Sequence, residues 1–341
     1  MKILDHIITF ILSIIMVSCS SIAENKSKSK VKINGVSYAA SKVLIDSIDL
    51  TTIKNIDAGW IALMPYAFIN EGGVQLNYNA SWQWKGESLE GITREIKICH
   101  QLGLKVMLKP HVWISHGEYT GDFMLNSDSN WVKFENSYSE YMLEFAAIAE
   151  EQHAELFCIG TEWRLFVKER PAYWSKLIMD IRKVYTGKLT YASNWDEYTE
   201  TPFWRELDFI GVNAYFPITK KENPTIEEVL QGWEPITEQL KSFSVEHEKP
   251  ILFTEYGYRS IEGTTIEPWV SDTKAVVSMK EQSLALEGLY ISNWKEDWLA
   301  GGFLWKWFNN ENKPRDGNQL GFTPQKKPAQ LVVKKYYEIE D

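Results

Sequence analysis

The chain has 341 residues, of which 44% are hydrophobic and 24% are charged, a composition that is ordinary for a globular enzyme. Its formal net charge of −10 argues against nucleic acid as a partner and against electrostatic docking on anionic lipid, because both reward basic surfaces. The aromatic content is high, with 15 Trp, 16 Tyr and 15 Phe. A large core accounts for many of these rings, and the sharper alternative is a set of stacking platforms for ring-shaped ligands.

The first predicted element is an export signal. Residues 7–17 form an apolar segment of signal-peptide length, which is too short for a comfortable membrane span. The segment runs into MVSCS, where Cys19 resembles the acylated cysteine of a bacterial lipoprotein. We therefore expect a lipoprotein-type signal peptide at 1–18 and a flexible tether at 19–32. An ordinary secretory signal or an uncleaved anchor is the alternative, and every version exports the protein to the cell envelope or beyond. Membrane contact is expected only through this lipid anchor.

Beyond the tether, short apolar runs alternate with segments of helical spacing. The runs are continuous rather than alternating in polarity, which is typical of strands buried on both faces. Helical spacing is clearest at 92–99, 138–148 and 174–184, a longer and weaker stripe covers 276–290, and 330–337 resembles a closing helix. The eight predicted strands are 33–37, 60–64, 106–108, 156–159, 189–192, 209–212, 251–253 and 302–305.

Eight strands that alternate with helices predict either a (β/α)8 barrel or a doubly wound sheet. The count of eight and the length favour the barrel. No GxGxxG follows a strand and no G-x-S-x-G elbow is present, which weakens the Rossmann and α/β-hydrolase alternatives. We therefore expect residues 33–341 to form a single (β/α)8 TIM barrel of the α/β class, and the protein to be a monomer. Cys99 and Cys158 are expected to be buried free thiols.

Polar and aromatic side chains follow the predicted strands, at the end of a barrel where active sites form. A single glutamate at a strand end is more often structural than catalytic. Two of them, Glu162 after the fourth strand and Glu255 after the seventh, lie across the barrel from each other. Facing carboxylates repel, so a purely structural pair would be unfavourable without a cation between them. The other candidates at this rim are Lys109, His111, Asn194, Asn213, Tyr215 and Trp305.

Facing carboxylates in an aromatic cleft have one leading chemistry, the hydrolysis of glycosidic bonds. One acid protonates the leaving oxygen, and the other attacks the anomeric carbon and forms a glycosyl-enzyme. No cofactor is needed for this reaction and none is expected. A metal enzyme built on His111, Glu162 and Glu255 is a weaker alternative, because no motif supplies a regular set of ligands.

Five segments resemble glycoside hydrolase family 113, a family of chiefly β-mannanases in clan A of the retaining glycosidases. The resemblance extends from about residue 33 to the end of the chain, with the motifs in the expected order. It implies a (β/α)8 barrel that cleaves β-mannosidic linkages, in β-1,4-mannan or manno-oligosaccharides, by double displacement. The segments are LKPHVW (108–113), IGTEW (159–163), DFIGVNAYFP (208–217), PILFTEYGYRS (250–260) and GFTPQKKPA (321–329).

The resemblance also implies a role for each matching residue. Glu162 would be the acid/base, and Glu255 would be the nucleophile, held ionised by Tyr215 with Arg259 as a further candidate. Trp305 would stack under the sugar next to the scissile bond. Contacts to sugar hydroxyls would come from Lys109, His111, Asn194 and Asn213.

One position departs from the clan. Most members have asparagine directly before the acid/base, where it contacts the sugar 2-hydroxyl, and this chain has Thr161. The 2-hydroxyl of mannose is axial, so a changed partner is compatible with manno-substrates.

Three questions stay open at this point. Clan A enzymes that act on xylan or β-glucan, and exo-acting β-mannosidases, have the same catalytic pair, so the pair does not separate them from a β-mannanase. A glycan-binding lipoprotein that has lost activity is a rival from a different class, although a binder has little reason to keep two facing carboxylates. The insert at 71–91, with Trp82 and Trp84, is a candidate wall or subsite of the cleft.

Overall fold

The computed structural model describes residues 31–270, 274–309 and 319–338. The predicted signal peptide, Cys19 and nearly all of the predicted tether lie outside these residues. No helix in the described part of the chain is both long enough and apolar enough to cross a membrane.

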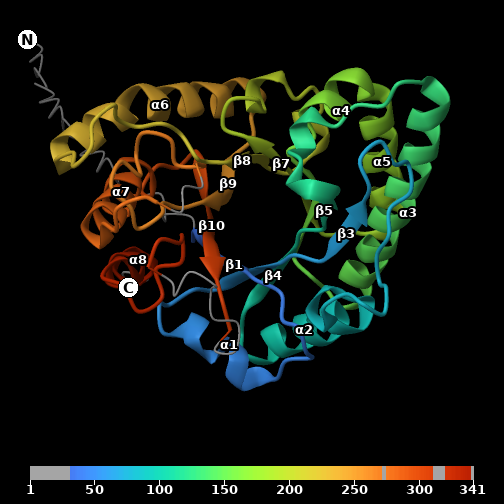
Figure 1. Cartoon of the computed structure of the whole chain (residues 1–341), viewed down its shortest axis with the longest axis horizontal. Helices are drawn as coiled ribbons and strands as arrows, with labels where there is room; N and C mark the ends of the chain where they lie inside the picture. Colours follow the sequence, from blue (N-terminus) through green and yellow to red (C-terminus); the bar gives the residue numbers. More distant parts are fainter. Residues whose placement is uncertain (1–30, 271–273, 310–318, 339–341) are drawn as a thin grey trace, which may run out of the picture. The chain divides into compact units, whose positions relative to one another are not determined.

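Eight parallel strands close into a barrel, and helices surround it (Figure 1). All eight predicted strands are present, and the fold is the expected (β/α)8 barrel. Going around the barrel, the order is β1-β10-β9-β8-β7-β6-β4-β2, and β2 pairs with β1. The strands are β1 (Ile33–Tyr38), β2 (Trp60–Leu63), β4 (Lys105–Leu108), β6 (Leu156–Thr161), β7 (Lys188–Asn194), β8 (Ile210–Asn213), β9 (Ile251–Tyr256) and β10 (Leu299–Trp307).

The predicted helical segments also fall in helices, except that the stripe 276–290 begins three residues before its helix, Met279–Asn293. The helix α2 buries one stripe, in which Ile92, Ile96 and Cys99 lie at helical spacing. Side chains that cap the first turn fix several helix starts: Ser88 accepts from the Gly91 amide. The helices are α1 (Ser47–Lys54), α2 (Leu89–Gln101), α3 (Asp128–Glu151), α4 (Arg164–Glu169), α5 (Pro171–Val184), α6 (Ile226–His247), α7 (Met279–Asn293) and α8 (Ala329–Tyr337). Short 3-10 helices cover Lys85–Glu87, Ser115–Gly117, Thr120–Asp122, Tyr198–Glu200 and Trp204–Glu206.

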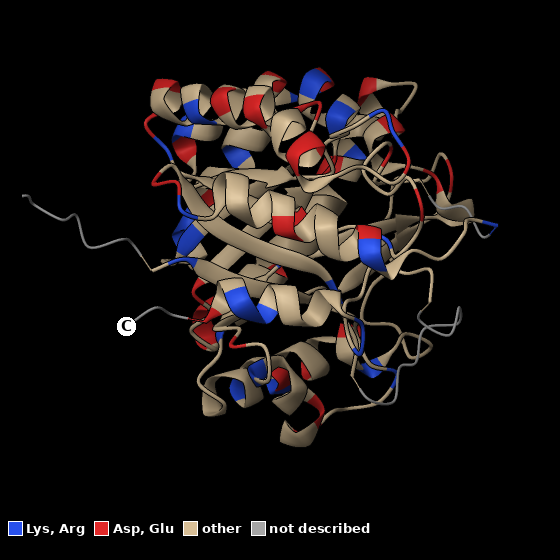
Figure 2. Ribbon diagram, turned by 90° about the vertical axis from the view of Figure 1, so that its left-hand side faces the viewer, with Lys and Arg blue, Asp and Glu red and all other residues tan. Residues whose placement is uncertain are grey.

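Charges of both signs lie along the outer helices. Figure 2 shows Lys and Arg interspersed with Asp and Glu there. On α5, for example, Asp180 pairs with Lys176 at 2.6 Å and with Lys183 at 2.7 Å. Such exposed pairs each contribute little to stability, and their main effect is a mixed, solvated surface.

The interior of the barrel is filled by its own apolar cluster. Seven of the eight barrel strands contribute to it, so the barrel is a packed core and not a pore. Cys158 belongs to this cluster and Cys99 is buried on α2, and both are free thiols as expected. The buried members are Ile33, Ala62, Met107, Leu156, Cys158, Ala192, Leu252 and Phe303.

Two short strands that the sequence patterns did not predict extend the barrel on one side. They are β3 (Tyr66–Ile69) and β5 (His111–Ile114), and they form a two-stranded parallel sheet of their own. Pro65 and Pro110 interrupt the strands before them, because proline has no N–H to donate to a ladder. The pairing continues past both prolines, through the His111 amide, which donates to the Pro65 carbonyl at 2.8 Å. Consequently β3 and β5 extend β2 and β4 beyond the carboxyl rim.

Candidate active site

Glu255 lies near the end of β9, where it is 5% exposed. Its Oε1 accepts a hydrogen bond from Lys109 Nζ, and its Oε2 accepts from the Tyr215 hydroxyl at 2.9 Å. Lys109, which follows β4, is fully buried, so its ammonium group meets the carboxylate with little competition from water. Burial and the charge of Glu255 raise the pKa of Tyr215, which therefore stays a donor. Two donors on one buried carboxylate stabilise its negative charge.

Glu162 directly follows β6 and has a backbone φ of 55°, in the left-handed region that residues other than glycine rarely adopt. Such conformations cost free energy and are concentrated at functional sites. Asn213 Nδ2 donates to Glu162 Oε1 at 2.7 Å. The Thr254 hydroxyl donates to Asn213 Oδ1 at 2.9 Å, so the other end of the amide faces Glu162. The strand ends of β8 and β9 thus orient the side chain that follows β6.

Glu162 and Glu255 have different electrostatic surroundings. Burial, and secondly the charge of Glu255, raise the pKa of Glu162 to about 7. The hydrogen bond from Asn213 and the charge of Lys109 oppose this rise. Near neutral pH Glu162 can therefore both hold and release a proton, and it lies beside a second carboxyl group that accepts a hydrogen bond from Lys109, an arrangement suited to acid–base chemistry.

His111, at the start of β5, lies on the same side of the site as Lys109. Its Nε2 is 4.0 Å from Glu255 Oε1. Burial, and then the charges of Lys109 and Lys306, hold the pKa of His111 well below its usual range, so the ring is neutral. No described residue forms a hydrogen bond with its Nε2 atom, although the atom is buried. The ring is nearly parallel to that of Trp305, with centroids 6.4 Å apart, so Trp305 reaches the same site from β10.

Asn194 enters a different part of the site. Its Nδ2 donates to the Tyr119 hydroxyl at 3.4 Å, and this hydroxyl donates to Glu197 Oε1 at 3.2 Å. Burial, and then the charge of Asp196, raise the pKa of Glu197 to about 7. The charge of Glu197 in turn contributes to the raised pKa of Glu162. Asn194 is thus part of a polar network on the side of Glu162.

Comparisons with known proteins identify the family of the chain. The sequence model described as Glycoside Hydrolase Family 113 matches residues 40–325. The chain belongs to Glycoside Hydrolase Family 113. It is therefore a glycoside hydrolase, as the sequence predicted. None of the curated proteins compared with the chain matches it.

Solved structures of family 113 share the fold. The chain resembles the GH113 β-mannanase AaManA from Alicyclobacillus acidocaldarius, in complex with ManMIm, with a TM-score of 0.79 and 24% identity over 90% of this chain and 97% of that one. A complex of a GH113 β-1,4-mannanase gives 0.78 and 22% identity over 91% and 99%. A β-glucuronidase from Ruminococcus gnavus, in complex with D-glucuronic acid, is more distant, with 0.60 and 14% identity over 90% of this chain and 50% of that one.

Several residues at the site of this family 113 chain escaped the sequence patterns. Thr254 directly follows the apolar run 251–253 and was not singled out, yet it sets the orientation of Asn213. Tyr66 opens β3, and its pKa is raised by burial and then by the nearby charge of Glu255. Tyr119 and Glu197 stand in loops, where no periodicity marks them. Among these residues, only Tyr66 could have been found from the sequence, because it directly follows the second predicted strand and its proline.

Arg259 anchors the C-terminal loop of the family 113 barrel. Its Nε donates to the Leu320 carbonyl at 3.0 Å and its Nη1 to the Val270 carbonyl at 2.8 Å. The anchored loop brings the Phe322 ring to 5.8 Å from the ring of Tyr215, edge to face. Arg259 therefore supports the tyrosine that donates to Glu255.

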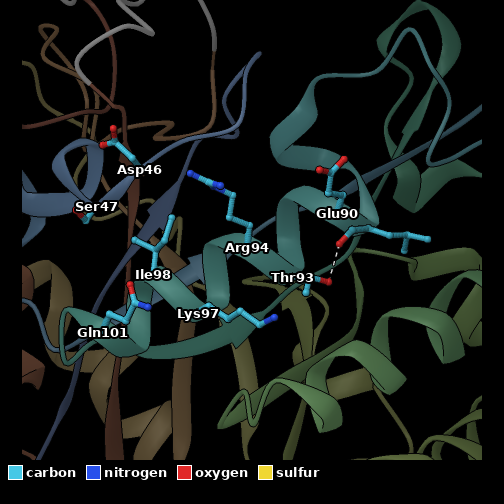
Figure 3. A pocket seen from close by; sticks show the side chains of 9 residues that line it. Asp46, Ser47, Glu90, Thr93, Arg94, Lys97, Ile98 and Gln101 are labelled. Carbon is cyan, nitrogen blue, oxygen red and sulfur yellow. Dashed lines mark hydrogen bonds between the residues drawn. The ribbon is translucent and has the colours of Figure 1, made fainter.

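A further hollow lies away from this site. It has a volume of about 700 Å³ and lies on the outer surface between α1 and α2. Figure 3 shows its side chains, among them Asp46, Glu90 and Arg94. None of the predicted catalytic or substrate-binding residues lines this hollow. The candidate active site is therefore identified by the electrostatically coupled Glu162 and Glu255 and not by cavity size.

The electrostatic coupling of the two glutamates gives a testable prediction. Replacing the negative charge by Glu255→Gln should lower the pKa of Glu162 below about 7, towards the 4.5 of an ordinary glutamate. The sign follows because removing a like charge favours the ionised form. A carbon-13 NMR titration of labelled glutamate carboxyls measures this shift, and Glu162→Gln assigns the resonance. An unchanged pKa in Glu255→Gln would show that burial alone sets it.

Proposed function

We propose that this family 113 hydrolase is a retaining β-mannanase, with Glu162 as acid/base and Glu255 as nucleophile. One observation carries the assignment: Glu255 accepts from Lys109 and Tyr215, whereas burial and the charge of Glu255 raise the pKa of Glu162 to about 7. The first environment favours a carboxylate that can attack. The second favours an acid that can give up a proton near neutral pH.

The reaction follows in two steps. In the first, a carboxylate oxygen of Glu255 bonds to the anomeric carbon, the glycosidic bond breaks, and the proton of Glu162 goes to the leaving oxygen. In the second, Glu162 takes a proton from water, the water oxygen bonds to the anomeric carbon, and the bond to Glu255 breaks. The second step returns both glutamates to their starting protonation states, and two inversions retain the anomeric configuration.

The surrounding residues orient the pair and the sugar. Asn213 holds Glu162 through a hydrogen bond whose direction is set by Thr254, so it acts as a positioning residue. Trp305 supplies an aromatic face for the sugar next to the scissile bond. The unpartnered Nε2 of His111 is available to a sugar hydroxyl. Asn194, in the network on the side of Glu162, is placed for a hydroxyl of the leaving part of the substrate.

The choice of a mannoside rests on two supports. Two of the similar solved structures are named as β-mannanases of family 113. In addition, the hydroxyl oxygen of Thr161, at the position where most clan members have asparagine, is buried without a hydrogen-bond partner in the described chain. A buried hydroxyl without a partner is costly, and a substrate hydroxyl would satisfy it. The axial 2-hydroxyl of mannose is the partner we propose.

Chemical rescue separates the two catalytic roles. With an activated aryl β-mannoside, Glu255→Ala should lose on the order of 10⁴–10⁶-fold in kcat, and azide should restore turnover with an α-mannosyl azide as product. Glu162→Ala should lose on the order of 10²–10⁴-fold, and azide should yield a β-mannosyl azide. The anomers differ because azide replaces the nucleophile in one variant and intercepts the glycosyl-enzyme in the other. Proton NMR of the products identifies them.

Glu197→Gln is the matched control for this experiment. Glu197 is also a buried glutamate with a pKa of about 7, but it bonds to Tyr119 and not to Asn213. Its variant should lose no more than about tenfold in kcat and should form no mannosyl azide. Rescue of Glu197→Gln, or reversed anomers in the other two variants, would overturn the assignment.

Substrate preference is tested with matched oligosaccharides. Manno-oligosaccharides should be hydrolysed with a higher kcat/KM than xylo- or cello-oligosaccharides of equal length, because only mannose presents an axial hydroxyl to Thr161. Chromatography of the products measures the rates, and Glu255→Ala is the blank. Activity on xylo-oligosaccharides alone would show that the substrate is xylan and not mannan. Activity of Glu255→Ala equal to that of the wild type would contradict the proposed mechanism.

We also propose that the protein is exported and bound to a bacterial membrane through a lipid on Cys19. The support is the sequence MVSCS at the end of the apolar segment 7–17. In a bacterial host, wild-type protein should incorporate labelled palmitate and sediment with membranes, whereas Cys19→Ser should do neither. Equal labelling of both proteins would contradict the lipid anchor.

A further inference from the structure

An aromatic surface leads away from the nucleophile along the small sheet of β3 and β5. In register, Tyr66 lies opposite His111 and Phe68 lies opposite Trp113. Side chains two apart in a strand point to the same face, so the face that carries His111 also carries Trp113. That face begins at the catalytic centre, because His111 Nε2 is 4.0 Å from Glu255 Oε1.

The outer part of this face is open to solvent. The other face of the sheet is buried, with Ala67, Ile69 and Ile114 in the core. By contrast, Trp113 is 51% exposed. Trp82, from the insert at 71–91, is 61% exposed, and its ring lies edge-on to Phe68 with centroids 5.0 Å apart. We name the rings of this face the aromatic wall: Tyr66, Phe68, Trp82, His111 and Trp113.

Buried hydrogen bonds fix the wall in place. The Tyr141 hydroxyl, from α3, donates to the carbonyl of Pro65 at 3.0 Å, directly before β3, and to that of His111 at 2.9 Å, at the start of β5. Gln83, next to Trp82, donates to the Tyr66 carbonyl at 2.8 Å and is itself buried. Rigid aromatic faces lose little entropy on binding, so a fixed wall favours a ligand that stacks on it.

The position of the wall shows which part of a glycan it faces. The nucleophile bonds to the anomeric carbon of the sugar that remains on the enzyme, and the acid/base contacts the leaving part. The wall starts at His111, beside the nucleophile. The network of Tyr119, Asn194 and Glu197 lies on the side of the acid/base. The wall therefore flanks the part of the substrate that is transferred to Glu255.

We propose that the aromatic wall is a glycone-side subsite, where Trp113 and Trp82 stack on mannose units beyond the one at the catalytic centre. This inference rests on the proposed function. Residues two apart in a strand are separated by roughly 6.6 Å, a step comparable with one sugar ring. The unpartnered Nε2 of His111 would bond to a hydroxyl at the inner end of the wall. The insert at 71–91 thereby gains a function that its sequence only suggested.

Aryl glycosides of increasing length isolate this side of the cleft. In 4-nitrophenyl β-mannoside, β-mannobioside and β-mannotrioside the leaving group is constant, so each added mannose lies on the glycone side. In the wild type, kcat/KM should rise with length. Trp113→Ala and Trp82→Ala should each lower kcat/KM on the longer substrates by about 3- to 10-fold. On the monomannoside, kcat/KM of both variants should stay within about twofold of the wild type. Trp113→Phe keeps an aromatic face and should retain most of the rise.

Trp84→Ala is the matched control. Trp84 belongs to the same insert and is 41% exposed, but Lys42 Nζ lies 5.5 Å from its ring centroid and it is not in the wall. Its variant should retain the full rise with length. An undiminished rise in Trp113→Ala and Trp82→Ala, or an equal loss on all three substrates, would overturn the subsite alone. If wild type cleaves none of the three, the proposed β-mannosidase chemistry fails as well.

Discussion

The hydrogen bonds that Lys109 and Tyr215 donate to Glu255 are the interactions on which the site depends. They join residues from three different strand ends, and they hold negative charge in a place where burial would otherwise disfavour it. That fixed charge then acts on Glu162, whose neutral form it favours. A closed parallel barrel makes the arrangement possible, because the carboxyl ends of all its strands meet at one rim.

The positions of the remaining groups follow from how the strands end. Past Pro65 and Pro110 the chain leaves the barrel but keeps its pairing, and His111 is thereby directed to Glu255. The same continuation carries Trp113 outward on the face of His111. His111 of the candidate active site and the aromatic wall therefore belong to one structural feature, the pairing of β2 with β4 that continues beyond the barrel rim as β3 and β5.

Much of this could be predicted from the chain alone. Continuous apolar runs at eight places predicted the barrel strands, because strands buried on both faces are mostly apolar. Glu162, Asn213 and Glu255 were identified because each breaks such a run at its carboxyl end. Thr254 was not, because a threonine next to an apolar run looks like an ordinary β-branched strand residue. Tyr119 and Glu197 were missed because loops have no periodicity that would mark them.

The sequence by itself determined the eight strands, the single barrel, the pair of glutamates and the family, because local patterns of polarity and spacing are enough to predict each of them. Only the tertiary structure decided that the pKa of Glu162 is raised, that Lys109 bonds to Glu255, and that Arg259 binds loop carbonyls. The physical reason is that electrostatic coupling and hydrogen bonding depend on distances between residues far apart in the chain. Those distances exist only after the barrel has closed.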